Sequence, residues 1–381
     1  MAHFWSKQPV PQSLKELTNC EANKQINESK LVNYNQVILP ENLFWYNVDI
    51  DNLEELDLLY CFLRNYYVGN DEYRFNYSKN FIQWALKPPG YKPEWILSIR
   101  SCIGKKPIVG FISATPATIS IHQTLYNIVE INYLCLHPKV RNNNLTPILI
   151  KEITRRANIH GIWQAVYTAG VTLPTPISTC TYHHRPLNTK KLMTLNFITN
   201  KLNTTLTQNI KLYKLPKTTT SKLRPIEKLD CDKACLNLNN YLNKYTLHTK
   251  FFIDDFEHWF ISRENVIETY VVEDPVTHDI TDMVSYYIIP STILNNIKYT
   301  SLYTAYLFYY FNTKMPLTQL IKDILIIANN KGLDVFNCLD VHNNSDFINE
   351  LKFKTGCKLN YYLYNYLTKP INPNDIGLIL L

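Results

Sequence analysis

Residues 130–144 read EINYLCLHPKVRNNN and join a strand-like alternation to a proline and a polar cluster. The pattern predicts a strand at 129–135 and a helix that begins at Thr146 and Pro147. A helix N-terminus presents unpaired N–H groups and a partial positive charge, which suit a phosphate that Arg141 could also bind. A strand end can direct two adjacent N–H groups at one oxygen and so form an oxyanion hole. An ordinary strand-to-helix loop with a solvated arginine explains the same residues, and the local pattern alone does not separate the two interpretations.

Two further groups of residues have types that could do chemistry. Adjacent His183 and His184 could form a catalytic pair or a polar wall of a binding site. The nine cysteines are scattered; only Cys231 and Cys235 are close, and no second pair stands at metal-ligand spacing. The sequence therefore predicts no metal site. An odd number of cysteines without a signal-peptide pattern favours reduced thiols and a cytoplasmic location.

The elements that position these residues follow one plan in both halves of the chain. In the first half we expect a helix that starts at 51–54, a short helix at 79–86, a hairpin within 94–116, the strand and helix above, and a strand at 163–167. In the second half we expect a helix over 232–245, a hairpin within 265–291 and a helix over 315–332. The repetition predicts a mixed α/β fold of two lobes joined near 215–225, with an irregular segment at 1–40.

The composition of the chain limits its class. It has 381 residues, 46% of them hydrophobic, so it can bury a sizeable core in two domains. No apolar run reaches ~18 residues, which predicts no transmembrane segment. The net charge of +7 fits an anionic ligand, an acidic surface or an ordinary basic protein. Basic residues do not cluster with aromatic residues, so we expect no nucleic-acid partner.

Residues 130–141, EINYLCLHPKVR, closely resemble the signature EINFLCVHKKLR of the N-myristoyltransferases (glycylpeptide N-tetradecanoyltransferases), which transfer myristate from myristoyl-CoA to the N-terminal glycine of proteins. The resemblance spans essentially the whole chain through HFWSKQPV (3–10), 150–188, KLYKLP (211–216), LRPIE (223–227), EHWF (257–260), IIPSTI (288–293), KGLDVFNCLD (331–340), 352–366 and IGLILL (376–381). It implies two fused GNAT-like acyltransferase lobes with pseudo-twofold symmetry: 1–215 for myristoyl-CoA, and 216–381 for the peptide and the catalytic C-terminus.

The resemblance also implies a mechanism without an enzyme nucleophile. The backbone N–H groups of Tyr133 and Leu134 would form the oxyanion hole, and the α-carboxylate of Leu381 would be the general base. Asn132 and Thr168 would orient the substrate amine. Myristoyl-CoA would be the acyl donor, with no separate cofactor and no metal. The partners would be peptides and nascent proteins with an N-terminal glycine, and we expect a monomer.

The remaining site residues follow from the same resemblance. The CoA phosphates would lie near Arg141, Asn142, Asn143, Asn144, Leu145 and Thr146, under a segment that contains His3, Phe4 and Trp5. The family commonly has RSKR where this chain has RNNN, so we expect weaker or more salt-tolerant CoA binding. Apolar strand residues near 109–114 and 163–167 are candidates for the acyl channel, with core packing as the alternative.

The peptide groove would include Tyr67, Tyr73, Phe75, Tyr77, Tyr182, His184, Ser291, Tyr306 and Leu380. Two acidic motifs of the family are missing: the loop YVEDDD is shortened to YVGNDE (67–72), and GIGDG is replaced by KTGCK (354–358). We therefore expect a reduced preference for lysine in the substrate. Two alternatives remain open: another GNAT-type N-acyltransferase that uses acetyl-CoA, and a non-enzymatic basic protein that binds nucleic acid or a membrane surface.

Overall fold

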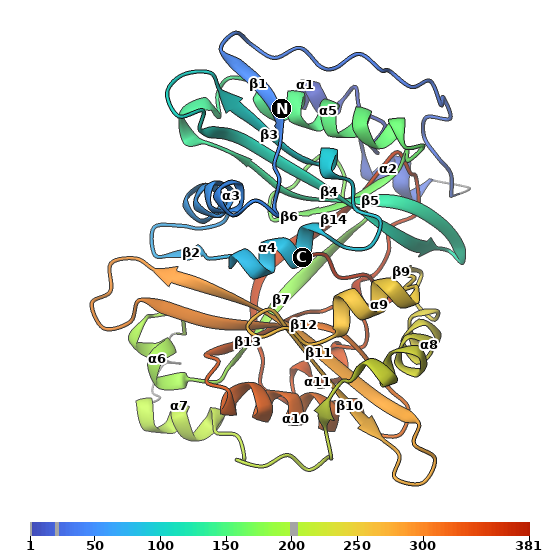
Figure 1. The fold of residues 1–381 in the computed structure, drawn as a ribbon. Coiled ribbons are helices and arrows are strands. Elements are labelled where there is room, and N and C mark those ends of the chain that lie inside the picture. Colours follow the sequence, from blue (N-terminus) through green and yellow to red (C-terminus); the bar gives the residue numbers. More distant parts are fainter. Residues whose placement is uncertain (1, 20–22, 199–204) are drawn as a thin grey trace.

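The computed structural model describes residues 2–19, 23–198 and 205–381, and within them it shows one 15-stranded mixed sheet flanked by helices (Figure 1). The elements lie along the chain in the order α1 (Ala2–Trp5), α2 (Leu14–Thr18), β1 (Leu43–Asn47), α3 (Leu53–Tyr66), β2 (Tyr73–Phe75), α4 (Lys79–Leu86), β3 (Ile96–Ser101), β4 (Ile108–Ile121), β5 (Thr124–Leu136), α5 (Leu145–Ile159), β6 (Ala165–Ala169), β7 (Ser178–Pro186), α6 (Thr189–Thr194), α7 (Leu206–Tyr213), β8 (Arg224–Pro225), α8 (Cys231–Leu242), β9 (Leu247–Thr249), α9 (Ile253–Phe260), β10 (Ile267–Glu273), β11 (Ile280–Ile293), β12 (Ser301–Asn312), α10 (Leu317–Asn330), β13 (Val335–Leu339), α11 (Ser345–Ile348), β14 (Lys354–Tyr364) and β15 (Ile376–Gly377).

The two halves of the chain repeat one plan. In the first half, α3 and α4 precede the antiparallel strands β3, β4 and β5, and α5 then leads to β6, which runs parallel to β5. In the second half, α8 and α9 precede β10, β11 and β12, and α10 leads to β13, which runs parallel to β12. The expected mixed α/β fold with a repeated plan is therefore confirmed.

The two halves exchange their last strands at the centre of the sheet. β7 follows β6 in the chain but pairs with β13, and β14 follows β13 but pairs with β6. β7 and β14 also pair with each other, so the central strand order is β6-β14-β7-β13. In Figure 1, β7 reaches into the half formed by β11, β12 and β13, and β14 lies beside β6. The C-terminal half therefore contributes a strand to the surroundings of β5 and β6.

Helices cover both faces of the sheet, and each helix packs the apolar side of its surface against the strands. α5 buries Leu145, Leu149 and Ile153 against β3, β4 and β5. α3 and α4 pack on the cluster that contains Phe111 of β4 and Tyr133 of β5, and α8 and α9 reach the same cluster from the second half. Each fully buried leucine or phenylalanine contributes roughly 1.5–3 kcal/mol of transfer free energy. This shared cluster holds the two halves together.

The predicted elements agree with the structure to different degrees. The short helix at 79–86 is confirmed as α4, and α3 begins at Leu53, within the expected 51–54, with the Asn52 side chain as its cap. The expected strand at 163–167 is β6 and begins later, at Ala165. The segment 1–40 was expected to be irregular, but it contains the short helices α1 and α2, the second capped by Ser13. The described residues contain no helix that is both long enough and apolar enough to span a membrane.

Candidate functional site

A cavity of about 750 Å³ opens where β5 and β6 separate. The two strands pair only at Val129–Glu130 and Ala165–Val166, and beyond this point their ends diverge. The cavity is lined by β5, α5, β6, β7, β14 and the last two residues of the chain. Its volume lies within the ~300–1,000 Å³ that is typical of small-molecule sites.

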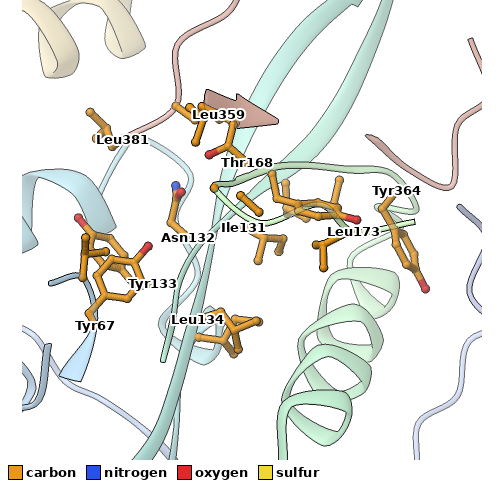
Figure 2. Close-up of a pocket in the computed structure, with 18 of the residues that line it drawn as sticks. Tyr67, Ile131, Asn132, Tyr133, Leu134, Thr168, Leu173, Leu359, Tyr364 and Leu381 are labelled. Atoms are coloured by element: carbon orange, nitrogen blue, oxygen red, sulfur yellow. The ribbon is translucent and has the colours of Figure 1, made fainter. Parts of the chain in front are cut away.

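One part of the cavity is apolar. Ile150, Ile153 and Ala157 line it from one side of α5, at the i, i+3, i+7 spacing of a helix face. Figure 2 shows Ile131 and Leu173 at its centre and Tyr364 beside the helix. Two segments proposed for an acyl channel do reach the cavity, through Ile112, Trp163, Gln164, Ala165 and Tyr167. The α5 face was not predicted, although its periodicity in the sequence was the available signal.

An aromatic stack closes this apolar part. The Trp5 ring stacks on Tyr167 at a centroid distance of 6.1 Å, and Tyr167 stacks on Tyr362 at 5.0 Å. Trp5 is buried, and its indole N–H has no hydrogen-bond partner among the described residues. Phe4 contacts Trp5 edge to face at 5.2 Å. The side chain of His3 lies outside the part of the chain that the structure describes.

A β-bulge interrupts β5 beside the cavity. Ser113 of β4 pairs with Asn132, but Phe111 pairs with Cys135, so Tyr133 and Leu134 together face Ile112 alone. Tyr133 has a φ of +56°, a left-handed conformation that costs about 1–3 kcal/mol in a bulky residue. The Tyr133 backbone lies close enough to the phenol of Tyr67, which lines the cavity, to offset part of the rise that burial causes in the Tyr67 pKa. Both residues of the bulge, Tyr133 and Leu134, line the cavity.

The end of the chain lies inside the protein. The Tyr361 hydroxyl donates to the Leu378 carbonyl oxygen at 3.0 Å, and the Tyr309 hydroxyl oxygen accepts the Ile379 N–H at 2.9 Å. Leu380 is buried and lines the cavity. The main chain is thus fixed up to the residue before Leu381.

The terminal carboxylate lies beside the β5 bulge. In the amide orientation that its surroundings require, the Asn132 side-chain nitrogen donates to a Leu381 terminal oxygen at 3.2 Å. Leu381 and Thr168 of β6 both line the cavity, and Figure 2 shows them on the same side of it as Asn132. The structure therefore brings together the five residues expected to act in catalysis: Asn132, Tyr133, Leu134, Thr168 and Leu381.

Five tyrosines and Phe75 form a wall of the cavity beside the β5 bulge. Tyr133 lies 5.4 Å from both Tyr67 and Tyr77, measured between ring centroids, and Tyr306 contacts Phe75 and Tyr182 at 6.5 and 6.3 Å. All of them line the cavity. Burial raises the pKa of Tyr67 to about 12 and raises the pKa of the other four tyrosines further. Each hydroxyl therefore keeps its proton at neutral pH and remains a hydrogen-bond donor.

His184 forms a neutral polar part of this wall. Its Nδ1 lies 2.7 Å from the Asn337 side-chain oxygen, and burial lowers the pKa of the ring, partly offset by this hydrogen bond. A Cβ atom at Gly356 would lie 2.0 Å from His184 Nε2, so this position of β14 tolerates no side chain while the ring stays in place. His183, the next residue on the strand, does not line the cavity. A catalytic pair of the two histidines finds no support in this geometry.

The predicted phosphate site lies next to the cavity, at the start of α5. Thr146 lines the cavity, whereas 141–145 do not. The Arg141 guanidinium donates to the carbonyl oxygens of Leu136 and Tyr66, each at 3.2 Å. Asn144, at the N-cap, has a φ of +53° and no side-chain cap bond, so the first N–H groups of α5 remain available.

Two residues expected in the peptide groove do not line the cavity. Tyr73 donates its hydroxyl proton to the Leu195 carbonyl at 2.9 Å, and the buried Ser291 pairs with Phe75 along β11 and β2. Asn337, Tyr287, Ile289 and Leu359 line the cavity but were not singled out in the sequence, and Cys357 and Lys358 of the KTGCK motif line it as well. No aspartate or glutamate side chain is among the described lining residues.

Comparisons with known proteins match this chain to one protein family. The N-terminal domain of the family "Myristoyl-CoA:protein N-myristoyltransferase" matches residues 22–180, and its C-terminal domain matches residues 194–378. Glycylpeptide N-tetradecanoyltransferase 1 of Arabidopsis thaliana is 44% identical, over 99% of this chain and 89% of its own length. The Dictyostelium discoideum glycylpeptide N-tetradecanoyltransferase is 42% identical, over 99% and 92%.

A comparison with solved structures matches this chain to the same family. The crystal structure of Saccharomyces cerevisiae N-myristoyltransferase with bound myristoyl-CoA superposes with a TM-score of 0.94 at 37% identity. The match covers 100% of this chain and 99% of that chain.

Proposed function

Because this chain belongs to the myristoyl-CoA:protein N-myristoyltransferase family, we propose that it transfers myristate from myristoyl-CoA to the α-amine of an N-terminal glycine. The observation that carries the proposal is the Leu381 carboxylate, held 3.2 Å from Asn132 at the edge of a large apolar cavity. An acyl chain with about a dozen buried methylenes gains on the order of 10 kcal/mol before entropy costs. The apolar part of the cavity is where these methylenes would be buried.

The thioester carbonyl would lie against the bulge of β5. Attack by the glycine amine places a negative charge on the carbonyl oxygen, and the N–H groups of Tyr133 and Leu134 stabilise it. Removal of one such donor typically costs about 2.7–4 kcal/mol of transition-state stabilisation. Loss of the thiolate then gives the amide and CoA.

The Leu381 carboxylate would be the general base. An N-terminal ammonium has a pKa of about 7.7–8.0 and must lose a proton before it can attack. The carboxylate accepts that proton, while the Asn132 amide holds it in place and the Thr168 hydroxyl orients the amine. Base catalysis of this kind contributes roughly 10²–10⁴-fold.

The two halves of the chain would divide the substrates between them. The N-terminal lobe, 1–215, would bind myristoyl-CoA, with the phosphates near 141–146 at the start of α5 and the segment that contains His3, Phe4 and Trp5 over the ligand. The C-terminal lobe, 216–381, would supply most of the peptide groove, together with Tyr67, Phe75, Tyr77, Tyr182 and His184. Tyr73 and Ser291 would support the groove from outside. We also propose a cytoplasmic, monomeric enzyme.

The aromatic wall suits an extended peptide because its hydroxyl groups and His184 offer neutral hydrogen-bond partners. Transfer of a short acetyl group is the alternative reaction of a GNAT-type fold, and the apolar face of α5 in the cavity favours the longer chain.

The proposal is tested by incubating the purified protein with a glycine-led peptide and acyl-CoA of two to sixteen carbons, with product masses measured. We expect transfer with an optimum near fourteen carbons. An alanine-led peptide of the same sequence is the control and should not react. Transfer of acetyl but not myristoyl groups would contradict the proposal.

A further inference from the structure

A second, smaller cavity borders the end of the chain, and Leu381 is the one described residue that lines both cavities. The small cavity has a volume of about 30 Å³. A space of this size holds about two water molecules. Carboxylate and ammonium side chains line it, from Glu130 of β5, from Lys250 and from Asp255 of α9. It therefore contains the groups that can carry a proton, on a side of Leu381 that the substrate cavity does not include.

Glu130 lies on the same face of β5 as Asn132. Residues two apart on a strand project to the same side, and Asn132 contacts the Leu381 carboxylate on that side. The Glu130 side chain forms no hydrogen bond or ion pair with the described residues, and burial raises the pKa of its carboxyl to about 8. This glutamate is a half-buried acid that the mechanism above does not use.

The groups that face Glu130 are few and identifiable. Tyr309 of β12 lies close enough that the Glu130 charge helps raise the pKa of its phenol, after burial. The Tyr309 hydroxyl is already engaged by Thr249 at 2.9 Å and by the Ile379 N–H. Lys250 and Asp255 are partly exposed and line the rest of the small cavity, and burial raises the pKa of Asp255. Apart from the Leu381 carboxylate, no other titratable group among the described residues lines this cavity.

The proposed reaction must discharge a proton. A thioester and an ammonium react to give an amide, a thiol and one proton: of the three ammonium hydrogens, one stays on the amide, one goes to the CoA sulfur and one is released. The released proton first resides on the Leu381 carboxylate, which must lose it before the next turnover. The acyl chain and the peptide occupy the large cavity during this step.

We propose that this proton leaves through the small cavity, from the Leu381 carboxylate through water to the carboxylate of Glu130, and then to solvent past Lys250 and Asp255. Glu130 does not touch the substrate; it is a positioning and relay residue that acts through Leu381. When Glu130 is already protonated, it first gives its proton to water and then accepts the proton from Leu381, so one proton is still released per turnover. The inference rests on the proposed N-myristoyltransferase function.

The test compares Glu130→Gln, Glu130→Asp and the wild-type protein in multiple-turnover experiments, in which enzyme is mixed with an excess of myristoyl-CoA and of a glycine-led peptide between pH 6 and 9. Glu130→Gln should slow acyl transfer roughly 10-fold or more, at the low end of acid–base effects, without changing the Kd of myristoyl-CoA or of the peptide. Glu130→Asp should retain most of the rate. Added formate or imidazole should accelerate Glu130→Gln in proportion to its concentration and leave the wild-type rate unchanged.

Glu264→Gln is the matched control because it makes the same chemical change on an exposed turn and should leave the rate unaltered. Ala117→Leu provides an independent variant: Ala117 lines the small cavity, and a larger side chain there should reproduce the loss with Glu130 intact. Wild-type rates in Glu130→Gln at every pH, or in Ala117→Leu, would overturn the relay. An inactive wild-type protein would instead refute the proposed function.

Discussion

The most direct perturbation of the proposed mechanism is to move the terminal carboxylate without unfolding the protein. Two glycines added after Leu381 displace the carboxylate by up to about 7 Å, at 3.3–3.6 Å per residue. The Asn132 nitrogen now lies 3.2 Å from a terminal oxygen, and a hydrogen bond does not survive a displacement of that size. The hydroxyls of Tyr361 and Tyr309 hold the main chain at Leu378 and Ile379, so the preceding residues should stay in place.

Loss of the base should lower kcat by roughly 10²–10⁴-fold, equivalent to about 2.7–5.4 kcal/mol of activation free energy. The assay is single-turnover transfer to a glycine-led peptide, together with calorimetric titration of myristoyl-CoA, whose affinity should not change because the apolar face of α5 is untouched. An added segment could also obstruct the peptide. A semisynthetic protein that ends in a Leu381 carboxamide has the native length without the charge, and it should lose the same activity. An extended or amidated protein with a rate near that of the wild type would refute the role of the carboxylate.

Three further predictions concern the peptide wall and a buried histidine. Gly356→Ala places a Cβ 2.0 Å from His184 Nε2, and the clash should displace the ring at a strain of about 1–3 kcal/mol. The KM for the peptide should therefore rise while the Kd of myristoyl-CoA stays constant. An unchanged peptide KM would contradict the role of His184 as part of the wall. Because the described lining of the cavity includes Lys358 but no carboxylate side chain, peptides that carry lysine downstream of the glycine should show no higher kcat/KM than their glutamine counterparts; a clear advantage for lysine would locate compensating acids elsewhere. Burial lowers the pKa of His342 from 6.5 to about 3, so between pH 3 and pH 6.5 only the unfolded chain binds a proton on this ring. The contribution of the neutral ring to the free energy of unfolding is therefore complete above pH 6.5 and is lost toward pH 3, at up to about 1.4 kcal/mol per pH unit. Urea unfolding between pH 4 and 7 should show a shallower dependence for His342→Asn, an amide that tolerates the positive φ at this position, and equal slopes would disprove the assignment.

Much of the site's local structure could be predicted from sequence. The alternation in 129–135 and the polar residues before Thr146 indicated a strand end next to a helix N-terminus, and both are present. The helix at 79–86 and the repeated plan of the two halves were also predicted correctly. Such features depend on the chain's own periodicity and on cap residues within a few positions, which a sequence displays directly.

Features that depend on contacts between distant segments were not predicted. The bulge that leaves Tyr133 and Leu134 opposite Ile112 arises from the register between β4 and β5, and no single residue type marks it. The α5 face that lines the cavity has the same period as a face that packs on a sheet, so periodicity alone could not distinguish the two. The small cavity beside Glu130 forms only where β5, α9 and the C-terminus meet.

The sequence by itself determined the family, the two-lobed plan and the residue types available at each end of β5, because these are properties of neighbouring residues. The tertiary structure decided where the last residue lies. The exchange of β7 and β14, together with the tyrosine hydroxyls that hold Leu378 and Ile379, carries Leu381 to Asn132. A carboxylate at the end of a chain is ordinarily solvated, and only long-range packing can bring it to the edge of a cavity inside the protein.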